Sequence, residues 1–223
     1  MKRAMIIAAH PDDETLGCGG IINKFRDSVE FKVVLIAEGT SCRYEECEDC
    51  KKEISKNIKI RKDAAKRALR GVSVSFYDLP CGKLDTVPQL KINKIIEKEL
   101  RQFQPDTVFT HWHGDLNVDH RKVYDATMIA TRPSVSPVKT VLCYEVLSTT
   151  ECNFKNAFNP NCFYSLSSDD MEAKCKNMLE FASECQQSPN PRSIESIKAL
   201  STYRGIQSGN KFAESFEIVR KII

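Results

Sequence analysis

The chain has 223 residues, of which 41% are hydrophobic and 28% are charged, as expected for a soluble protein with a single domain over residues 1–223. Its 33 basic and 30 acidic residues give a net charge of +3, so it lacks the strongly basic character of a nucleic-acid-binding protein. No apolar run reaches the roughly 18 residues that span a bilayer. The first predicted strand follows directly on Met-Lys-Arg, so we expect no signal peptide and a cytoplasmic location.

Strand-like and helical segments alternate along the first two thirds of the chain. Short apolar runs predict strands at 4–9, 31–37, 72–77, 107–109 and 140–146. Helical spacing of apolar residues predicts helices at about 14–27, 53–70, 88–103 and 119–131. This alternation indicates an α/β fold, a Rossmann-like three-layer sandwich with a mostly parallel sheet. The common strand order 3-2-1-4-5 would make the first and fourth strands neighbours at the switch point.

The pattern changes beyond residue 146. The remaining predicted elements are helices at 168–185 and 193–207 and a strand at 216–222. Asn159-Pro and Ser188-Pro predict loops between them. We expect these C-terminal additions to complete the sheet and to wall a pocket. Arg192 and Arg204 could each bring a guanidinium to an anion there, or be ordinary charges at helix ends.

A dense polar cluster, His10-Pro-Asp-Asp-Glu14, follows the first predicted strand. Because Pro11 holds the preceding residue extended, the chain turns here before the helix begins. The side chains therefore gather at the carboxyl end of the strand, where imidazole and carboxylate groups can bind a metal or carry protons. The alternative is a capped helix, in which Asp12 or Asp13 only accepts hydrogen bonds from the first amides.

A second cluster, Thr110 to Arg121, follows the fourth predicted strand. The chain has four histidines, and all lie in the two clusters: His10, His111, His113 and His120. In the strand order above, both clusters lie at the same edge of the sheet, where α/β proteins bind their ligands. Since imidazole and carboxylate are the usual ligands of catalytic zinc, the two clusters predict one shared metal site and metal-assisted hydrolysis.

These motifs resemble those of the LmbE-like, or PIG-L, family of N-acetylglucosaminyl-phosphatidylinositol de-N-acetylases, which are zinc-dependent amide hydrolases. The resemblance rests on Ala9-His-Pro-Asp-Asp-Glu-Thr15, on the following Gly17-Cys-Gly-Gly20 and on Asp119-His120. Weaker similarities lie at 144–148, 190–193 and 213–216. The resemblance thus extends over nearly the whole chain.

The resemblance implies a role for each residue of the two clusters. His10, Asp13 and His120 would bind Zn²⁺ and leave positions open for water and a substrate oxygen. Asp12, next to a ligand but not on the metal, would be the general base. Asp119 would orient a neighbouring side chain.

Two positions depart from the pattern that many family members share. A histidine three residues before the last ligand helps to stabilise the tetrahedral oxyanion in those members, and this chain has Asn117 there. The role would be weaker, or pass to His111 or His113, because an amide brings no positive charge. Many members also read Pro-His-Pro-Arg-Ser where this chain has Pro189-Asn-Pro-Arg-Ser193. The general acid therefore stays open.

The resemblance implies a deacetylase for an N-acetylated amino sugar, in a sugar nucleotide or a lipid-linked glycan precursor. One alternative is a metal-dependent amidase that acts on a thiol or antibiotic conjugate. Another is a catalytically silent sugar-binding domain, although such a module has no need of Asp12. The sequence leaves the oligomeric state open, a homo-oligomer included.

Ten cysteines are many for a chain of this length. In a long chain without a secretion signal we expect most of them to be free thiols, and Cys18 to be an inert group in the first helix. Cys42, Cys47 and Cys50 offer three thiolates for a structural zinc, with Cys81 as a fourth across space, but a charged mobile loop is the favoured interpretation. Gly17 to Gly20 do not fit a dinucleotide fingerprint, so we expect them to let the first helix pack closely.

Overall fold

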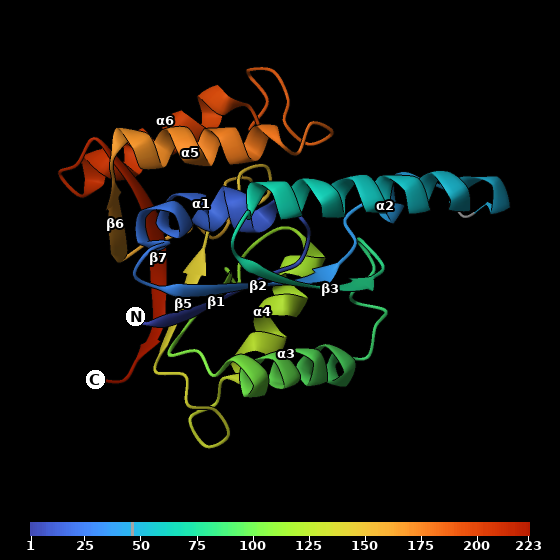
Figure 1. Ribbon diagram of the computed structural model, residues 1–223, viewed down its shortest axis with the longest axis horizontal. Coiled ribbons are helices and arrows are strands. Elements are labelled where there is room, and N and C mark those ends of the chain that lie inside the picture. The colour runs from blue at the N-terminus through green and yellow to red at the C-terminus, as the bar shows by residue number, and fades with distance from the viewer. Residues whose placement is uncertain (46) are drawn as a thin grey trace.

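The computed structural model describes residues 1–45 and 47–223, and a seven-stranded sheet forms its centre (Figure 1). The strands are β1 (Arg3–Ala8), β2 (Glu30–Ala37), β3 (Ser73–Leu79), β4 (Thr107–His111), β5 (Thr140–Tyr144), β6 (Cys162–Leu166) and β7 (Phe212–Lys221). Their order in the sheet is β3-β2-β1-β4-β5-β7-β6, and β7 pairs antiparallel with both of its neighbours. The first five strands are parallel. The predicted fold class and the order 3-2-1-4-5 are confirmed.

Helices cover both faces of this sheet. They are α1 (Asp13–Phe25), α2 (Glu48–Ala68), α3 (Gln89–Phe103), α4 (Val118–Ala130), α5 (Ser168–Leu179) and α6 (Ile194–Gln207), with a short 3₁₀ turn, η1 (Ser41–Arg43). Figure 1 shows α1, α2, α5 and α6 on one side of the sheet and α3 and α4 on the other. The architecture is therefore a three-layer sandwich. Within the described residues, no helix has both the length and the apolar character needed to cross a bilayer.

The alternation of side chains along each strand divides the hydrophobic interior into two cores. On β1, Ala4 and Ile6 belong to the core shared with α1, α2 and α5, whereas Met5 and Ile7 belong to the core shared with α3 and α4. All four are fully buried. Because both faces are covered, the central strands are continuous apolar runs, which is why the sequence identified them.

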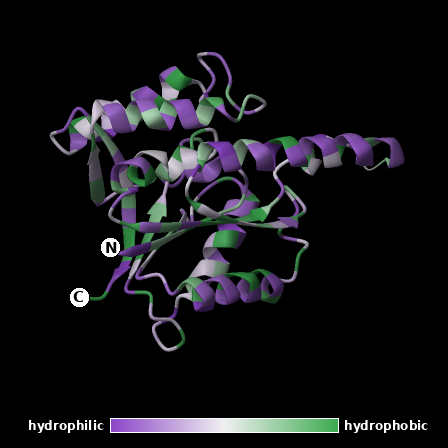
Figure 2. Ribbon diagram, in the orientation of Figure 1, coloured by the Kyte–Doolittle hydropathy of each residue, from purple (hydrophilic) through white to green (hydrophobic). Residues whose placement is uncertain are grey.

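The largest differences from the prediction concern four elements. The edge strand β6 was not predicted, because it has only five residues and most of them are partly exposed. Strand β7 begins at Phe212, and α5 ends at Leu179, earlier than expected in both cases. Helix α2 begins at Glu48, so part of the predicted charged loop is helical; position 46 of that loop lies outside the described residues. Figure 2 shows mostly hydrophilic residues along α2, whose first half extends away from the sheet.

The glycines of α1 bring this helix close to the sheet, as predicted. A Cβ on Gly17 would lie 2.3 Å from the Tyr144 ring, and one on Gly20 would lie 2.4 Å from Leu166 Cδ1. Any other residue at either position would push α1 away from β5 and β6. The close approach fixes the start of α1, at Asp13, above the carboxyl ends of the central strands.

Candidate metal centre and active site

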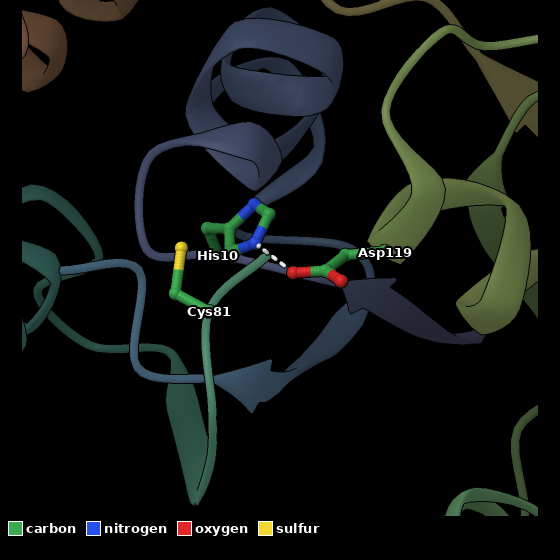
Figure 3. Close-up of side chains that lie close together, drawn as sticks. All are labelled: His10, Cys81 and Asp119. Carbon is green, nitrogen blue, oxygen red and sulfur yellow. Dashed lines mark hydrogen bonds and ion pairs between the residues drawn. The ribbon is translucent and has the colours of Figure 1, made fainter. Parts of the chain in front are cut away.

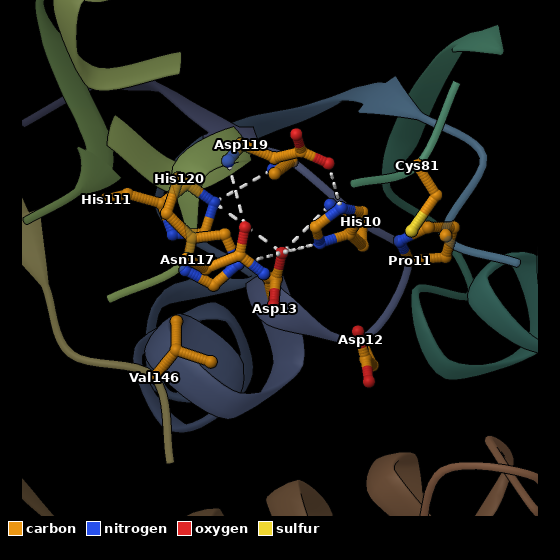
Figure 4. Close-up of polar contacts among 12 residues, drawn as sticks. His10, Pro11, Asp12, Asp13, Cys81, His111, Asn117, Asp119, His120 and Val146 are labelled. Atoms are coloured by element: carbon orange, nitrogen blue, oxygen red, sulfur yellow. Dashed lines mark hydrogen bonds and ion pairs between the residues drawn. The ribbon is translucent and has the colours of Figure 1, made fainter. Parts of the chain in front are cut away.

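The two polar clusters meet where β1 and β4 end side by side (Figure 4). His10 lies in the turn after β1, and Asp13 is the first residue of α1. His120 lies in the first turn of α4, which follows β4. The strand order therefore joins residues that are more than a hundred positions apart, as the sequence predicted.

His10, Asp13 and His120 form a compact group of side chains that could hold a metal ion. The Oδ2 atom of Asp13 lies 3.2 Å from His10 Nδ1 and 3.3 Å from His120 Nε2. Two ligand atoms bound at about 2 Å to one tetrahedral ion lie roughly 3.3 Å apart. In addition, Asp13 Oδ1 and His120 Nε2 are buried and have no hydrogen-bond partner. The spacing and the unsatisfied atoms both fit a bound Zn²⁺.

Two further carboxylates hold the histidines in place. Asp119 Oδ2 lies 2.8 Å from His10 Nε2, so the proton belongs on Nε2 and the Nδ1 lone pair faces Asp13. Asp115 Oδ1 lies 3.2 Å from His120 Nδ1, on the side of the ring away from Asp13. Such partners fix the tautomer and the orientation of metal-binding histidines.

The cluster attracts positive charge. Burial raises the pKa of Asp13, but the charge of His120, together with the hydrogen bond and charge of His10, outweighs it and holds that pKa well below its usual range. Burial lowers the pKa of His120, but Asp13 and Asp115 raise it to about 10. Burial also opposes a proton on His10, whose hydrogen bonds to Asp119 and Asp13 nevertheless raise its pKa. A metal cation can take the place of these protons.

Asp12 is equally buried but lies outside the donor set, and Figure 4 shows its carboxylate turned away from that of Asp13. Arg61 Nη2 lies 3.0 Å from its Oδ1, and Arg192 Nη1 lies 3.2 Å from its Oδ2. Burial raises the pKa of Asp12 more than Arg192 and Arg61 lower it. Its φ of 125° is rare for a residue with a side chain and costs about 1–3 kcal/mol. The adjacent Asp12 and Asp13 thus occupy different environments.

His111 lies beside the donor set as a neutral imidazole. Its Nε2 accepts a hydrogen bond of 2.8 Å from the Ala9 N–H, and its ring stacks on His120 with centroids 3.9 Å apart. Burial and the charge of His120 hold its pKa well below the usual value. Its Nδ1 is buried without a hydrogen-bond partner.

The other two residues considered for the oxyanion role have different surroundings. Asn117 caps α4, since its Oδ1 accepts a hydrogen bond of 2.9 Å from the Asp119 N–H. His113 is exposed, and its ring contacts Trp112 and Tyr124 and none of the metal donors. The structure therefore brings Asn117 to the edge of the cluster and leaves His113 outside it.

The family model described as PIG-L: GlcNAc-PI de-N-acetylase matches residues 5–131, more than half of the chain and the part that holds both clusters. The chain belongs to the PIG-L family. The resemblance of the two motifs is thereby confirmed. None of the curated proteins matches the chain significantly.

Solved structures share the whole fold of this PIG-L family chain at low sequence identity. The N,N'-diacetylchitobiose deacetylase from Pyrococcus horikoshii is 22% identical, with a TM-score of 0.76 over 98% of this chain and 84% of that one. GalB, the 4-carboxy-2-hydroxymuconate hydratase from Pseudomonas putida KT2440, is 21% identical, with a TM-score of 0.75 over 100% and 98%. The zinc-inhibited form of teicoplanin deacetylase Orf2 is 15% identical, with a TM-score of 0.76 over 99% of both chains.

A network of arginines behind Asp12 was not predicted. Glu184 accepts hydrogen bonds of 2.6 and 2.7 Å from Arg43 and one of 2.8 Å from Arg192, and it lies 3.6 Å from Arg61. Burial raises the pKa of Glu184, but the three guanidinium groups lower it to about 2. The chain thus balances three cations with two carboxylates, Asp12 and Glu184, next to its PIG-L motif.

Two other residues need comment. No role was predicted for Asp115, the partner of His120. The sequence signal that could have identified it is a carboxylate in the second motif, five positions before His120. Arg204, predicted either to bind an anion or to be a helix-end charge, pairs with Glu145 at 2.6 Å and has no contact with the metal donors. Of the two arginines considered, only Arg192 reaches the site.

Most of the ten cysteines are free thiols, as expected. Cys47 and Cys50 form a disulfide with an S–S distance of 2.14 Å, while the other eight are free. A zinc site made from Cys42 and these two is therefore not formed in the structure. Cys18 is buried in α1, where burial holds its pKa well above the usual value, as expected for an inert thiol.

Proposed function

We propose that this protein is a zinc-dependent N-deacetylase that hydrolyses the acetamide of an N-acetylated amino sugar. One observation carries the proposal: a buried carboxylate, Asp12, lies beside a donor set of two histidines and one aspartate but does not belong to it. Metal-dependent amide hydrolysis needs both a metal site and a free base. Membership of the PIG-L family supports acetamide as the bond that is cleaved.

His10, Asp13 and His120 would hold the metal. Bound there, Zn²⁺ would polarise the acetamide carbonyl and lower the pKa of water towards ~7. Asp119 keeps a proton on His10 Nε2, so that this ring directs Nδ1 to Asp13, and the Asp115 carboxylate lies beside Nδ1 of His120, whose Nε2 faces Asp13. These contacts fix the donors before any ligand arrives.

Asp12 would act as the general base. Its carboxylate takes a proton from the attacking water and returns a proton to the nitrogen that leaves, which gives acetate and a free amine. Arg61 and Arg192 hold this carboxylate from two sides, and burial raises its pKa towards the working pH, where a general base is most effective. Because no histidine stands at Asn117, we assign the contact with the developing oxyanion to Arg192, which faces Asp12 and is partly exposed.

The test is the release of free amine and acetate by the zinc-loaded protein. The substrates are N-acetylglucosamine, N,N'-diacetylchitobiose, UDP-N-acetylglucosamine and N-acetylglucosaminyl-phosphatidylinositol. Release from at least one of them, abolished by Asp12→Asn, supports the proposal. Hydrolysis confined to an acylated glycopeptide antibiotic or a thiol conjugate would favour the amidase alternative.

A broader control is needed because the fold does not fix the reaction. The structural similarity to a hydratase shows that one scaffold carries different chemistry. Binding of an acetylated sugar without any turnover in the zinc-loaded protein would instead indicate a silent binding domain and would contradict the proposal.

A further inference from the structure

A pair of thiols lies next to the metal donors and has no part in the proposed hydrolysis. Cys42 Sγ and Cys81 Sγ are 3.1 Å apart. Cys81 Sγ also lies within 4.8 Å of a ring nitrogen of His10 and of a carboxylate oxygen of Asp119 (Figure 3). Cys81 Sγ thus lies close to a second thiol, that of Cys42, and close to the Asp119 carboxylate.

A buried carboxylate holds the two thiols together. Cys42 lies in the segment after β2, and Cys81 lies in the segment after β3. Glu38, which is 4% exposed, accepts hydrogen bonds of 2.9 Å from the Cys81 N–H, 2.6 Å from the Thr40 N–H and 3.0 Å from the Ser41 N–H. One side chain therefore joins both segments, and the approach of the sulfurs follows from this bridge.

The glycine after Cys81 completes the arrangement. Gly82 has a φ of 71°, and a Cβ on it would lie 3.0 Å from Cys42 Cβ. Its N–H donates a hydrogen bond of 2.6 Å to Asp119 Oδ2. The same glycine thus leaves room for Cys42 and holds the Asp119 carboxylate on the Cys81 side of the cluster.

We propose that Cys42, Cys81 and Asp119 form a second cation site, specific for thiophilic divalent ions such as Zn²⁺ or Cd²⁺. Thiolates and a carboxylate are ligands that zinc accepts. On a tetrahedral zinc, two sulfurs at 2.3 Å would lie about 3.8 Å apart, so the pair needs to open by roughly 0.7 Å. A disulfide would instead need the two sulfurs to close by about 1 Å.

A cation bound at Cys42, Cys81 and Asp119 would disturb the group formed by His10, Asp13 and His120. Asp119 Oδ2 is the partner of His10 Nε2, so a cation on that oxygen competes with the hydrogen bond that orients His10. Excess zinc is therefore inhibitory, while the first equivalent is required. This consequence rests on the proposed function, but the existence of the site does not.

The test counts ions in the full-length protein under a phosphine reductant. Cd²⁺ is added stepwise, with the ultraviolet thiolate-to-cadmium band and the bound metal as the two readings. The wild type should bind about two ions per chain and develop the band. Cys42→Ser and Cys81→Ser should each bind one ion fewer and lose the band, whereas His120→Ala should lose an ion and keep the band. Cys42 is exposed, so its variant decides the matter if Cys81→Ser does not fold.

The matched control removes the other thiols of the same segment. The reductant opens the Cys47–Cys50 disulfide, so the double variant Cys47→Ser/Cys50→Ser must keep both ions and the band. Loss of the band in the double variant, with retention in Cys42→Ser, would overturn the proposal. So would a wild type that binds one ion without the band, or the recovery of Cys42 and Cys81 as a disulfide. None of these readings depends on turnover, so a failed deacetylase assay would not affect them.

Discussion

The sharpest test of the proposed mechanism is to separate Asp12 from Asp13, two adjacent and chemically identical side chains. Asp12→Asn keeps the size of the side chain but removes the base. A general base contributes about 10²- to 10⁴-fold to the rate, which corresponds to roughly 3–5 kcal/mol of activation free energy. We expect kcat to fall by about that factor, while zinc stays bound because all three donors are intact.

The structure also limits how much this substitution should destabilise the fold. Removing one partner from a buried ion pair costs about 3–5 kcal/mol when the other charge is left alone. Here Arg61 keeps hydrogen bonds to the carbonyls of Pro11 and Gly39, and Arg192 keeps Glu184. The loss should therefore be nearer 1–2 kcal/mol. For a chain of this size that lowers Tm by about 2–8 °C, so the variant stays folded for assay.

Asp13→Asn is the matched control. It replaces an anionic donor by a weak neutral one, so zinc content and activity should fall together. The assays are kcat from amine release and zinc per chain by mass spectrometry, with circular dichroism for Tm. If Asp12→Asn loses zinc while Asp13→Asn keeps it, the two roles are exchanged. If Asp12→Asn keeps near-normal kcat, the base lies elsewhere and His111 is the next candidate.

Four further results are expected. His120→Ala should lose its zinc, because the two remaining donors bind weakly, and near-stoichiometric metal in this variant would contradict the ligand set. Asp115→Asn should weaken zinc binding by about 10- to 100-fold, as measured in a competition with a chelator. The pKa of the Glu184 carboxyl is lowered to about 2 in the folded protein, whereas its value in the unfolded chain is near 4.3. The ionised carboxylate therefore stabilises the fold at any pH above about 4.3, and this stabilisation is lost as the pH falls towards 2. The Tm difference between wild type and Glu184→Gln should shrink over that range, and a constant difference would show that the charge has no part. Thiol titration of unfolded protein purified without reductant should find eight free thiols, and ten after reduction of Cys47–Cys50; ten before reduction would disprove the disulfide.

The sequence was sufficient for most of the fold because the relevant signals are local. Each central strand is buried on both faces and therefore forms a continuous apolar run, and each helix repeats its apolar residues every three or four positions. The strand order then followed from the general rules for crossovers. Strand β6 gave no such signal, since a five-residue, partly exposed edge strand is defined by its pairing with β7 rather than by its own composition.

The family resemblance implied which residues form the donor set, and the sequence pattern explains why they meet. His10 and Asp13 lie within one turn, and His120 lies in the turn after a neighbouring strand, so a local motif and a strand order were enough to bring them together. The different environments of Asp12 and Asp13 were implied by the family resemblance. Their physical cause, a backbone strained at Asp12 and turned towards two arginines, required coordinates.

Only the tertiary structure shows the contacts between segments whose own sequences have no hydrophobic periodicity or motif. Arg61 is one of many basic residues on a charged helix, and Glu184 lies in irregular chain, so nothing in their neighbours marks them as members of the network around Asp12. For Arg192 the sequence left an anion-binding role open but did not name Asp12 as its partner. Cys81 reaches His10 because β2 and β3 end at the same edge of the sheet and Glu38 ties their following segments together. The sequence determined which residues form each element and its periodicity; the packing of those elements determined which loops meet, because that depends on distances across the fold that no local pattern records.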